Sequence, residues 1–154
     1  MSSQVAGITP DGNFNITIPM FSMLEKKNFF PQTKWETVTI DPDTAKDYDD
    51  AISLIVDEKG HYHLGVHIAD VAHYVKPGMH LDEEAFARCN STYFPGTCVP
   101  MLPEALSNEL CSLKPKVIRF TQTVVAEIDP KGNLVQYEIF RSAIKSAKRF
   151  TYKE

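Results

Sequence analysis

The sequence has no apolar run that approaches the roughly 20 residues of a membrane-spanning helix. Its first ten residues lack the basic start and the apolar centre of a secretory signal peptide. Cysteine is scarce: Cys89, Cys98 and Cys111 never form a C-x-x-C pair, which argues against a disulfide framework and against a structural zinc site. Internal repeats and low-complexity segments are absent as well. A cytoplasmic globular protein with reduced thiols and no membrane partner is therefore expected.

With 154 residues, 43% of them hydrophobic and 23% charged, the chain is long enough for one globular domain with a core. Its charge is uneven: positions 1–110 hold 7 basic and 16 acidic residues, whereas positions 111–154 hold 9 and 4. Aromatic residues lie among the basic ones of the second part. A solvated strand face explains this pattern as well as a nucleic-acid surface does, so the basic tract alone does not establish nucleic-acid binding.

Apolar alternation predicts more strands than helices. The expected strands cover residues 38–40, 51–56, 61–68, 120–128 and 134–144. A turn with the sequence Asp-Pro-Lys-Gly-Asn joins the last two as a hairpin. A short helix is expected over 81–88, and prolines predict an irregular chain over 93–106 with a helical turn over 104–108. The predicted fold class is α/β, with a mixed, strand-rich, largely antiparallel sheet and short helices.

Acidic residues crowd the connection between the first two expected strands. Five aspartates lie within ten residues there: Asp41, Asp43, Asp47, Asp49 and Asp50. Lys46 is the one basic residue among them, and the rest of the chain balances at 15 basic and 15 acidic residues, so this cluster accounts for the net charge of -4. Packed carboxylates raise one another's pKa unless a cation lies among them, and carboxylate oxygens are the ligands that hard divalent cations prefer.

The cluster is not an EF-hand loop. Counted from Asp41, the fifth, sixth and twelfth positions are Ala45, Lys46 and Ile52, where that loop needs an oxygen ligand, a glycine and a glutamate. Catalytic magnesium or manganese, structural calcium and an exposed acidic loop remain as interpretations. Two hard cations about 4 Å apart can stabilise both the attacking water and the leaving oxygen of a phosphodiester, so the pattern favours metal-assisted phosphoryl chemistry.

The cluster and four further blocks resemble the RNB catalytic domain of the RNase II/RNase R family, with bacterial RNase R the nearer relative. In chain order the blocks are TIDPDTAKDYDDAI (39–52), VHIADVAHYV (66–75), STYFP (91–95), PMLP (100–103) and LSNELCSL (106–113). The resemblance implies magnesium-dependent hydrolysis of RNA from its single-stranded 3′ end, with release of nucleoside 5′-monophosphates. It makes residues 35–154 the first half of an RNB-type domain. Residues 1–34 are then a weakly patterned N-terminal segment, with a hairpin expected around Phe14 to Ile18.

By the same resemblance, the family's four catalytic aspartates correspond to Asp41, Asp47, Asp49 and Asp50. Asp41, Asp47 and Asp50 are expected to hold magnesium or manganese. Hydrolysis is expected to depend most on Asp49. Tyr93 matches the tyrosine that stacks on the 3′-terminal nucleotide, whereas Asp43 matches a variable position. No catalytic role is implied for His67, Asp70 and His73, which are expected to be structural hydrogen-bonding groups.

The chain departs from the family pattern in length. The sequence ends inside the family block SAKRFTYKE (146–154), and an RNB domain is longer. By resemblance, the second half carries an arginine at the scissile phosphate, a glutamate near the site and a second aromatic residue of the nucleotide clamp. A second chain or a missing C-terminal half is therefore expected to complete the active site, and the isolated chain is expected to degrade RNA slowly or not at all. A non-catalytic RNA-binding or interaction module derived from the same domain is the alternative.

Overall fold

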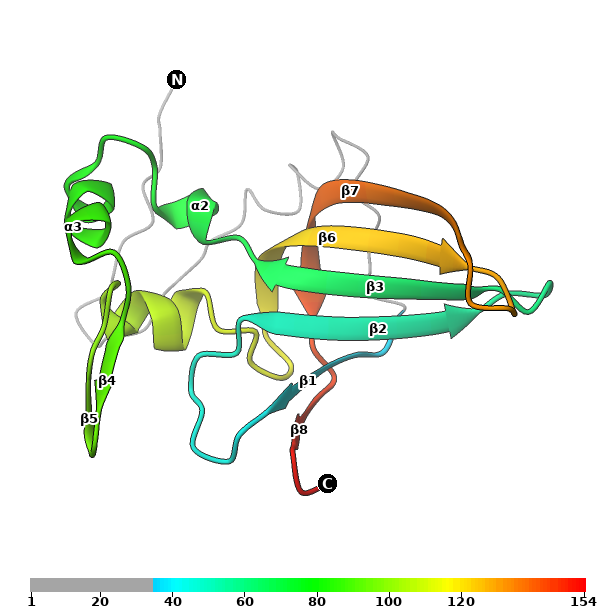
Figure 1. Ribbon diagram of the computed structural model, residues 1–154, viewed down its shortest axis with the longest axis horizontal. Coiled ribbons are helices and arrows are strands. Elements are labelled where there is room, and N and C mark those ends of the chain that lie inside the picture. The colour runs from blue at the N-terminus through cyan, green and yellow to red at the C-terminus, as the bar shows by residue number, and fades with distance from the viewer. Residues whose placement is uncertain (1–34) are drawn as a thin grey trace. The chain divides into compact units, whose positions relative to one another are not determined.

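The structure is a computed structural model that describes residues 35–154, so the hairpin expected around Phe14 to Ile18 lies outside it. Six strands form one sheet in the order β7-β6-β3-β2-β1-β8 (Figure 1). Their bounds are β1 Thr37–Asp41, β2 Asp50–Val56, β3 Tyr62–Ala69, β6 Ile118–Ile128, β7 Leu134–Lys145 and β8 Lys148–Thr151. All neighbours pair antiparallel except β1 and β8, which pair parallel. The strand-rich, largely antiparallel sheet expected from the sequence is confirmed.

Two hairpins supply most of the sheet, and their turns are built alike. In each turn an aspartate carbonyl accepts a hydrogen bond from the N–H of a glycine three residues later, Asp57 from Gly60 and Asp129 from Gly132. Both glycines have a positive φ, 78° and 86°, a conformation that carries a steric penalty for other residues. The aspartate side chains accept further backbone hydrogen bonds within the same turns. These turns fix the registers of β2 with β3 and of β6 with β7.

Short elements follow β3 and lie beyond one end of the sheet (Figure 1). They are α2 (Val71–Tyr74), α3 (His80–Arg88), β4 (Thr92–Phe94), β5 (Thr97–Val99) and the π-helix η2 (Ala105–Leu110). The helix α3 confirms the prediction over 81–88, and η2 confirms a helical turn near 104–108. Within the part of the chain that the structure describes, no helix is long and apolar enough to cross a membrane.

The prediction of an irregular chain over 93–106 is wrong at its start, because β4 and β5 pair as a hairpin. Pro95 and Gly96 form the turn between them. A proline in a turn needs no backbone donor, and Gly96 adopts a positive φ of 79° there. The proline that argued against regular structure therefore makes the turn that joins the two strands.

One face of the sheet is polar and buried. Its side chains include His67 of β3, which lies between Ser53 of β2 and Thr123 of β6, and Thr121 and Ser142 extend the same network. All five are at most 2% exposed. Because every one of these side chains has a hydrogen-bond partner, their burial carries little desolvation penalty.

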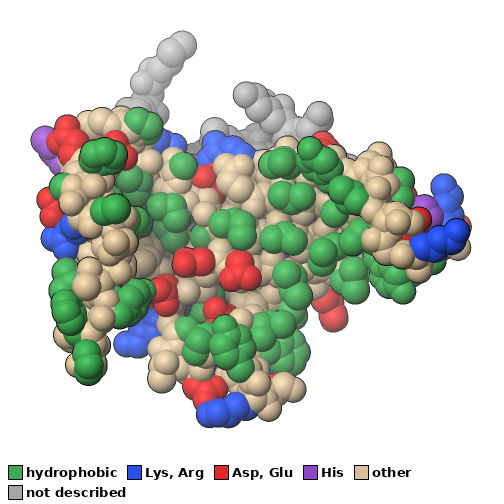
Figure 2. Space-filling view, viewed as in Figure 1, with side chains coloured by type: hydrophobic (Ala, Val, Ile, Leu, Met, Phe, Trp, Pro, Cys, Tyr) green, Lys and Arg blue, Asp and Glu red, His purple; other side chains and the backbone are tan. Residues whose placement is uncertain are grey.

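The opposite face carries large apolar side chains that are 38–63% exposed, which we call the open apolar face. They are Ile40, Ile52, Leu54, Val56, Tyr62, Ile68, Tyr137 and Ile139. Figure 2 shows hydrophobic side chains spread over the sheet. A buried apolar cluster lies instead where the sheet meets the short elements, and it contains Ala51, Ala69, Leu106, Cys111, Leu113 and Ile144. An exposed apolar surface that crosses several strands is typical of a surface that another part of a protein covers.

Candidate active site

The aspartate cluster lies on the connection between β1 and β2, as the sequence predicted. Asp41 is the last residue of β1 and Asp50 is the first of β2, while Asp47 and Asp49 lie in the connection itself. Asp41 is buried at 8% exposure. Irregular backbone between two strand ends allows carboxylates from one short segment to approach each other from different directions.

Two residues far along the chain fix the backbone of this connection. The Ser112 hydroxyl accepts a hydrogen bond from the Tyr48 N–H (3.1 Å) and donates one to the Lys46 carbonyl (2.8 Å). The Leu113 N–H donates to the Tyr48 carbonyl (2.8 Å). From β3, the Ala69 N–H donates to the Asp49 carbonyl (2.9 Å). Because Ser112 and Leu113 are at most 1% exposed, these contacts tie the loop to buried residues of the protein.

Burial and neighbouring negative charges raise the pKa of Asp41 and of Asp49. The pKa of Asp41 is raised mainly by burial, and the negative charges of Asp50 and Asp47 add to the shift. The pKa of Asp49 is raised mainly by partial burial and next by the charge of Asp47. The charges of Asp47 and Asp50 thus disfavour ionisation of Asp41 and Asp49, and a bound cation would relieve this repulsion.

The donor atoms of the cluster have the chemistry that a hard divalent cation prefers. The Oδ2 atom of Asp41 is buried and has no hydrogen-bond partner, which is costly for a carboxylate unless a cation or a donor compensates it. All the candidate ligands are carboxylate oxygens, the chemistry that magnesium and manganese prefer. Among residues 35–154, however, no three ligand atoms of these aspartates lie within 4.8 Å of one another. The carboxylates thus lie on one loop, but no three of them meet at a single point.

Residues near the C-terminal end of the chain flank the loop, and the sequence did not predict this contact. The Arg149 guanidinium donates to the Pro42 carbonyl at 2.5 Å and lies over the Tyr48 ring, 5.3 Å from its centroid. Its charge opposes the upward shift of the Asp41 pKa. Asp43 forms an ion pair with Lys153 instead of joining the other aspartates. Arg149 was visible in the sequence only as one member of a basic tract.

A cavity of about 600 Å³ brings Tyr93 to the aspartates. Its lining includes Asp47, Asp49 and Tyr93, together with Met101 and Ser107 from the segment that follows β5. Tyr93 lies on β4 and is 72% exposed. Asp47 and Tyr93 line the cavity together, and the negative charge of Asp47 raises the pKa of Tyr93. The tyrosine and the two aspartates thus share one cavity, although more than 40 residues separate them in the chain.

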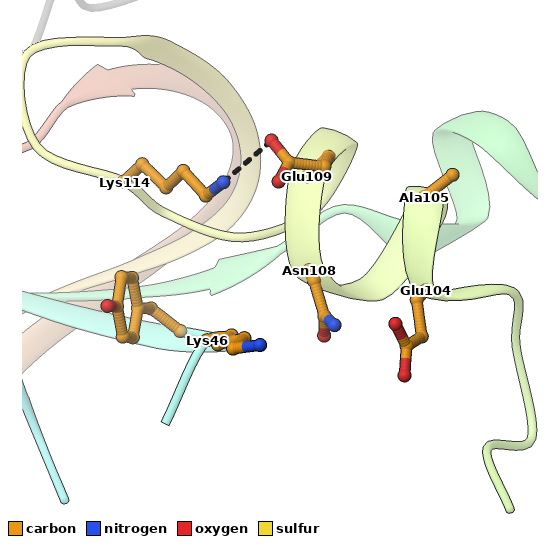
Figure 3. Close-up of a pocket in the computed structure, with 7 residues that line it drawn as sticks. Lys46, Glu104, Ala105, Asn108, Glu109 and Lys114 are labelled. Atoms are coloured by element: carbon orange, nitrogen blue, oxygen red, sulfur yellow. Dashed lines mark ion pairs between the residues drawn. The ribbon is translucent and has the colours of Figure 1, made fainter. Parts of the chain in front are cut away.

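A second pocket, of about 410 Å³, lies beside Lys46 (Figure 3). Lys46, Glu104 and Asn108 line both cavities, so the two adjoin. Lys114 and Glu109 form an ion pair of 2.6 Å at the far side of this pocket (Figure 3). The mixture of amide, ammonium and carboxylate groups makes this pocket polar, in contrast to the more apolar wall beside Tyr93.

The histidines and the aspartate that follow the cluster have structural partners, as the sequence predicted. The ring of His67 lies 2.9 Å from both the Ser53 and the Thr123 hydroxyls, and burial lowers its pKa to about 4. Asp70 is 3% exposed and accepts two hydrogen bonds from Arg141, at 2.5 and 2.8 Å. The same guanidinium lies 3.2 Å from His73 Nδ1. These contacts join β2, β3, β6 and β7.

Comparison with known proteins identifies the family. The model of the RNB domain matches residues 32–154, which include the aspartate connection, the Tyr93 hairpin and the Ser112 anchor. The chain belongs to the RNB domain family. A ribonuclease R of Chlamydia pneumoniae is 60% identical over 116 residues, which are 75% of this chain and 17% of that protein.

Solved structures show the same fold. Mycoplasma genitalium RNase R has been solved in complex with double-stranded RNA and with ribose-methylated single-stranded RNA. Each gives a TM-score of 0.80 at 39% identity over 86% of this chain, which corresponds to 23% and 20% of the respective solved chains. This RNB segment therefore spans about a sixth of the curated relative and less than a quarter of the solved proteins.

Proposed function

We propose that this RNB segment supplies the aspartate side of an exoribonuclease active site, which hydrolyses RNA from a single-stranded 3′ end and releases nucleoside 5′-monophosphates. The observation that carries the proposal is the shared cavity of Asp47, Asp49 and the exposed Tyr93, beside a loop that buried Ser112 fixes. Carboxylates beside an exposed aromatic ring suit a site that cleaves the backbone and accepts any base. The RNA complexes of the Mycoplasma relative support RNA as the substrate class.

Magnesium, or manganese in its place, would be held by Asp41, Asp47 and Asp50. The partnerless, buried Oδ2 of Asp41 supports this assignment. When bound, the metal supplies Lewis-acid stabilisation of the phosphate and an activated water. Asp49 is proposed as the residue on which hydrolysis depends most. Asp49 lines the cavity together with Asp47 and Tyr93, which is where the scissile phosphate is proposed to lie.

The Tyr93 ring is proposed to stack on the 3′-terminal nucleotide. Its 72% exposure leaves a ring face available for this contact. In a complete RNB protein, Tyr93→Ala is expected to change the length of the final oligonucleotide more than the cleavage rate, because stacking positions the RNA end without taking part in bond breaking. Gel analysis of the limit products measures both quantities, and an unchanged limit product would refute the assignment.

The rest of a larger RNB domain, on the same polypeptide or on a second chain, is proposed to cover the open apolar face and to complete the active site. The exposure of these side chains supports this, as does the small share of its relatives' length that the segment spans. A cytoplasmic location belongs to the same proposal, since RNA is the substrate.

The central experiment compares Asp49→Asn with Asp43→Asn in a complete RNB protein that carries these residues. Asp49→Asn is expected to lower the hydrolysis rate by about two orders of magnitude or more with RNA binding retained, because a preorganised group at the reaction centre is lost. Asp43→Asn is the matched control and should leave the rate unchanged, since Asp43 pairs with Lys153 outside the group. Equal rates in both variants would contradict the assignment.

The 154-residue chain by itself is expected to bind magnesium weakly and to release mononucleotides slowly or not at all. Rapid magnesium-dependent release by the pure chain would contradict the proposal that another segment completes the site. Loss of RNA binding in Asp49→Asn would favour the alternative of a non-catalytic RNA-binding module.

A further inference from the structure

A second group of ionisable side chains lies at the opposite end of β2 and β3 from the aspartate loop. It contains Asp57, His61, His63 and Glu127, and we call it the hairpin cluster. Asp57 lies seven positions after Asp50 along the extended chain, which places the two groups about 23 Å apart. Figure 2 shows a histidine next to acidic side chains at this tip of the molecule. The hairpin cluster is therefore separate from the candidate active site.

The sheet register places the four side chains on one face. His63 of β3 lies directly opposite Glu127 of β6 in the antiparallel ladder. The ring of His61 is on the same side, because its Nδ1 atom lies 2.7 Å from Glu127 Oε1. Asp57 follows the end of β2, and its N–H donates to the His61 carbonyl at 3.0 Å. Three neighbouring chain segments thus direct their side chains to one place.

The distances suit a single metal ion. Asp57, His63 and Glu127 each offer one ligand atom, and these atoms all lie within 4.8 Å of one another. This is the one such set among residues 35–154. His63 Nε2 and Asp57 Oδ2 are 3.2 Å apart. Two ligands of a tetrahedral ion with bonds of about 2.0 Å are separated by about 3.3 Å, so this pair already has the spacing of a coordination edge.

Hydrogen bonds fix the orientation of the Asp57 and Glu127 carboxylates. The Oδ1 atom of Asp57 accepts the N–H groups of Lys59 (2.8 Å) and His61 (2.9 Å), so Oδ2 faces His63. The Oε2 atom of Glu127 accepts from the Gln136 amide at 2.6 Å, and its Oε1 lies 2.7 Å from His61 Nδ1. Partners of this kind orient the ligands of known metal sites.

We propose that the hairpin cluster binds one divalent transition-metal ion of the zinc and cobalt class, through the imidazole of His63 and the carboxylates of Asp57 and Glu127. Water would complete the coordination, because the His61 ring already pairs with Glu127 Oε1. Two carboxylates neutralise the charge of the ion, and an imidazole nitrogen favours zinc or cobalt over magnesium. The ion would join the β2–β3 turn to β6. The aspartate loop, whose donors are all oxygen, would retain its preference for magnesium.

The test is a titration of the 154-residue chain with Co²⁺ in saturating magnesium, which fills sites made of oxygen ligands. Visible absorption from cobalt reports coordination by nitrogen and oxygen, and it separates this from binding to Cys89 or Cys98, which would add an intense thiolate charge-transfer band. The expected result is one equivalent of cobalt without that band. No binding, or a thiolate band, would overturn the proposal.

Variants locate the ion. His63→Gln and Glu127→Gln are each expected to weaken cobalt binding at least about tenfold, and Gln136→Leu to weaken it by a similar factor through loss of ligand orientation. His80→Gln is the matched control, because His80 is exposed and pairs with Glu83 at 3.4 Å on α3. Cobalt binding that survives His63→Gln, or that His80→Gln reduces equally, would overturn the site.

A measurement on the unaltered chain makes the test independent of variant folding. Titration with diamagnetic Zn²⁺ in magnesium should shift the ring NMR signals of His63 and leave those of His80 in place. Shifts confined to other histidines would overturn the proposal even if each variant failed to fold.

Discussion

The two ends of β2 carry clustered carboxylates, but they are built in different ways. At the start of β2, long-range contacts hold the aspartate loop: Ser112 bonds to residues 64 and 66 positions earlier, and Arg149 reaches Pro42 across 107 positions. At the end of β2, the turn from Asp57 to His61 is closed by its own backbone and by one aspartate side chain. The loop therefore depends on the fold of most of the chain. The turn depends on five consecutive residues, although Glu127 joins the hairpin cluster from the distant strand β6.

This difference explains why the aspartate loop can carry strained electrostatics. Asp41 and Asp49 have raised pKa values, so the loop by itself would separate its charges. Buried hydrogen bonds from Ser112 and Leu113 prevent that separation. At the turn, hydrogen bonds lower the pKa of Asp57, and no remote support is needed. Perturbed carboxylates held by remote, buried anchors are typical of functional sites.

The largest effect is expected from Ser112→Ala, which removes the remote anchor. The change leaves the Tyr48 N–H and the Lys46 carbonyl without their partner, so the free energy of unfolding should fall by about 2 to 3 kcal/mol. Affinity for magnesium should fall with it, because the carboxylates lose their fixed positions. Urea denaturation and calorimetric titration measure the two quantities.

Ser107→Ala is the matched control for this change. The Ser107 hydroxyl makes one weak contact, 3.3 Å to the neighbouring Asn108 side chain. Its removal should change the free energy of unfolding by less than about 0.5 kcal/mol. Equal destabilisation by the two variants would mean that Ser112 does not anchor the loop.

A smaller effect is expected from acid, through His67 on the strand that joins the two ends. Its folded pKa of about 4 lies below the ordinary value of 6.5 because burial disfavours the charged ring. The unfolded chain therefore binds the proton more readily between these values, so stability is fully present above pH 6.5 and is lost as the pH falls toward 4. The loss from pH 7 to pH 5 should be about 2 kcal/mol in urea denaturation.

The raised carboxyl pKa values of the aspartate loop act in the opposite direction, since protonation of Asp41 and Asp49 is easier in the folded chain. His67→Gln isolates the histidine, because it keeps a hydrogen-bonding group beside Ser53 and Thr123 and cannot titrate. The part of the pH dependence of the unfolding free energy that the wild type shows and this variant lacks is due to His67. If both chains lost the same stability from pH 7 to pH 5, the assignment to His67 would be wrong.

Local signals in the sequence predicted most of the strands, since β2, β3, β6 and β7 alternate in character and are joined by turns with a characteristic glycine. They did not predict β8, whose parallel pairing with β1 depends on residues about 110 positions apart. They also misjudged the β4–β5 hairpin, because a proline signals both an irregular chain and a turn. Pairing between distant segments leaves no short-range pattern for such reasoning to use.

The sequence likewise predicted only part of the candidate site. The aspartates were visible as a charge cluster, and family resemblance gave each one an expected role. The Ser112 anchor lies in a block that the resemblance included without a role for that hydroxyl. Arg149 was one basic residue among nine, and only the fold brings it to the loop. The hairpin cluster was missed because its ligands come from separate strands, so no spacing along the chain indicates it.

The smallest effect is expected at the locally built end, from Gly60→Ala. The positive φ of 78° strains an alanine, which should lower the free energy of unfolding by about 1 kcal/mol. The new Cβ would meet Pro130 at 3.7 Å, an ordinary contact, so backbone conformation alone sets the cost. Gly60→Asn is the matched control and should lose less, because asparagine tolerates this conformation. Magnesium affinity should stay unchanged in both variants. A loss of magnesium affinity as large as that expected for Ser112→Ala would show that the two ends of β2 are coupled.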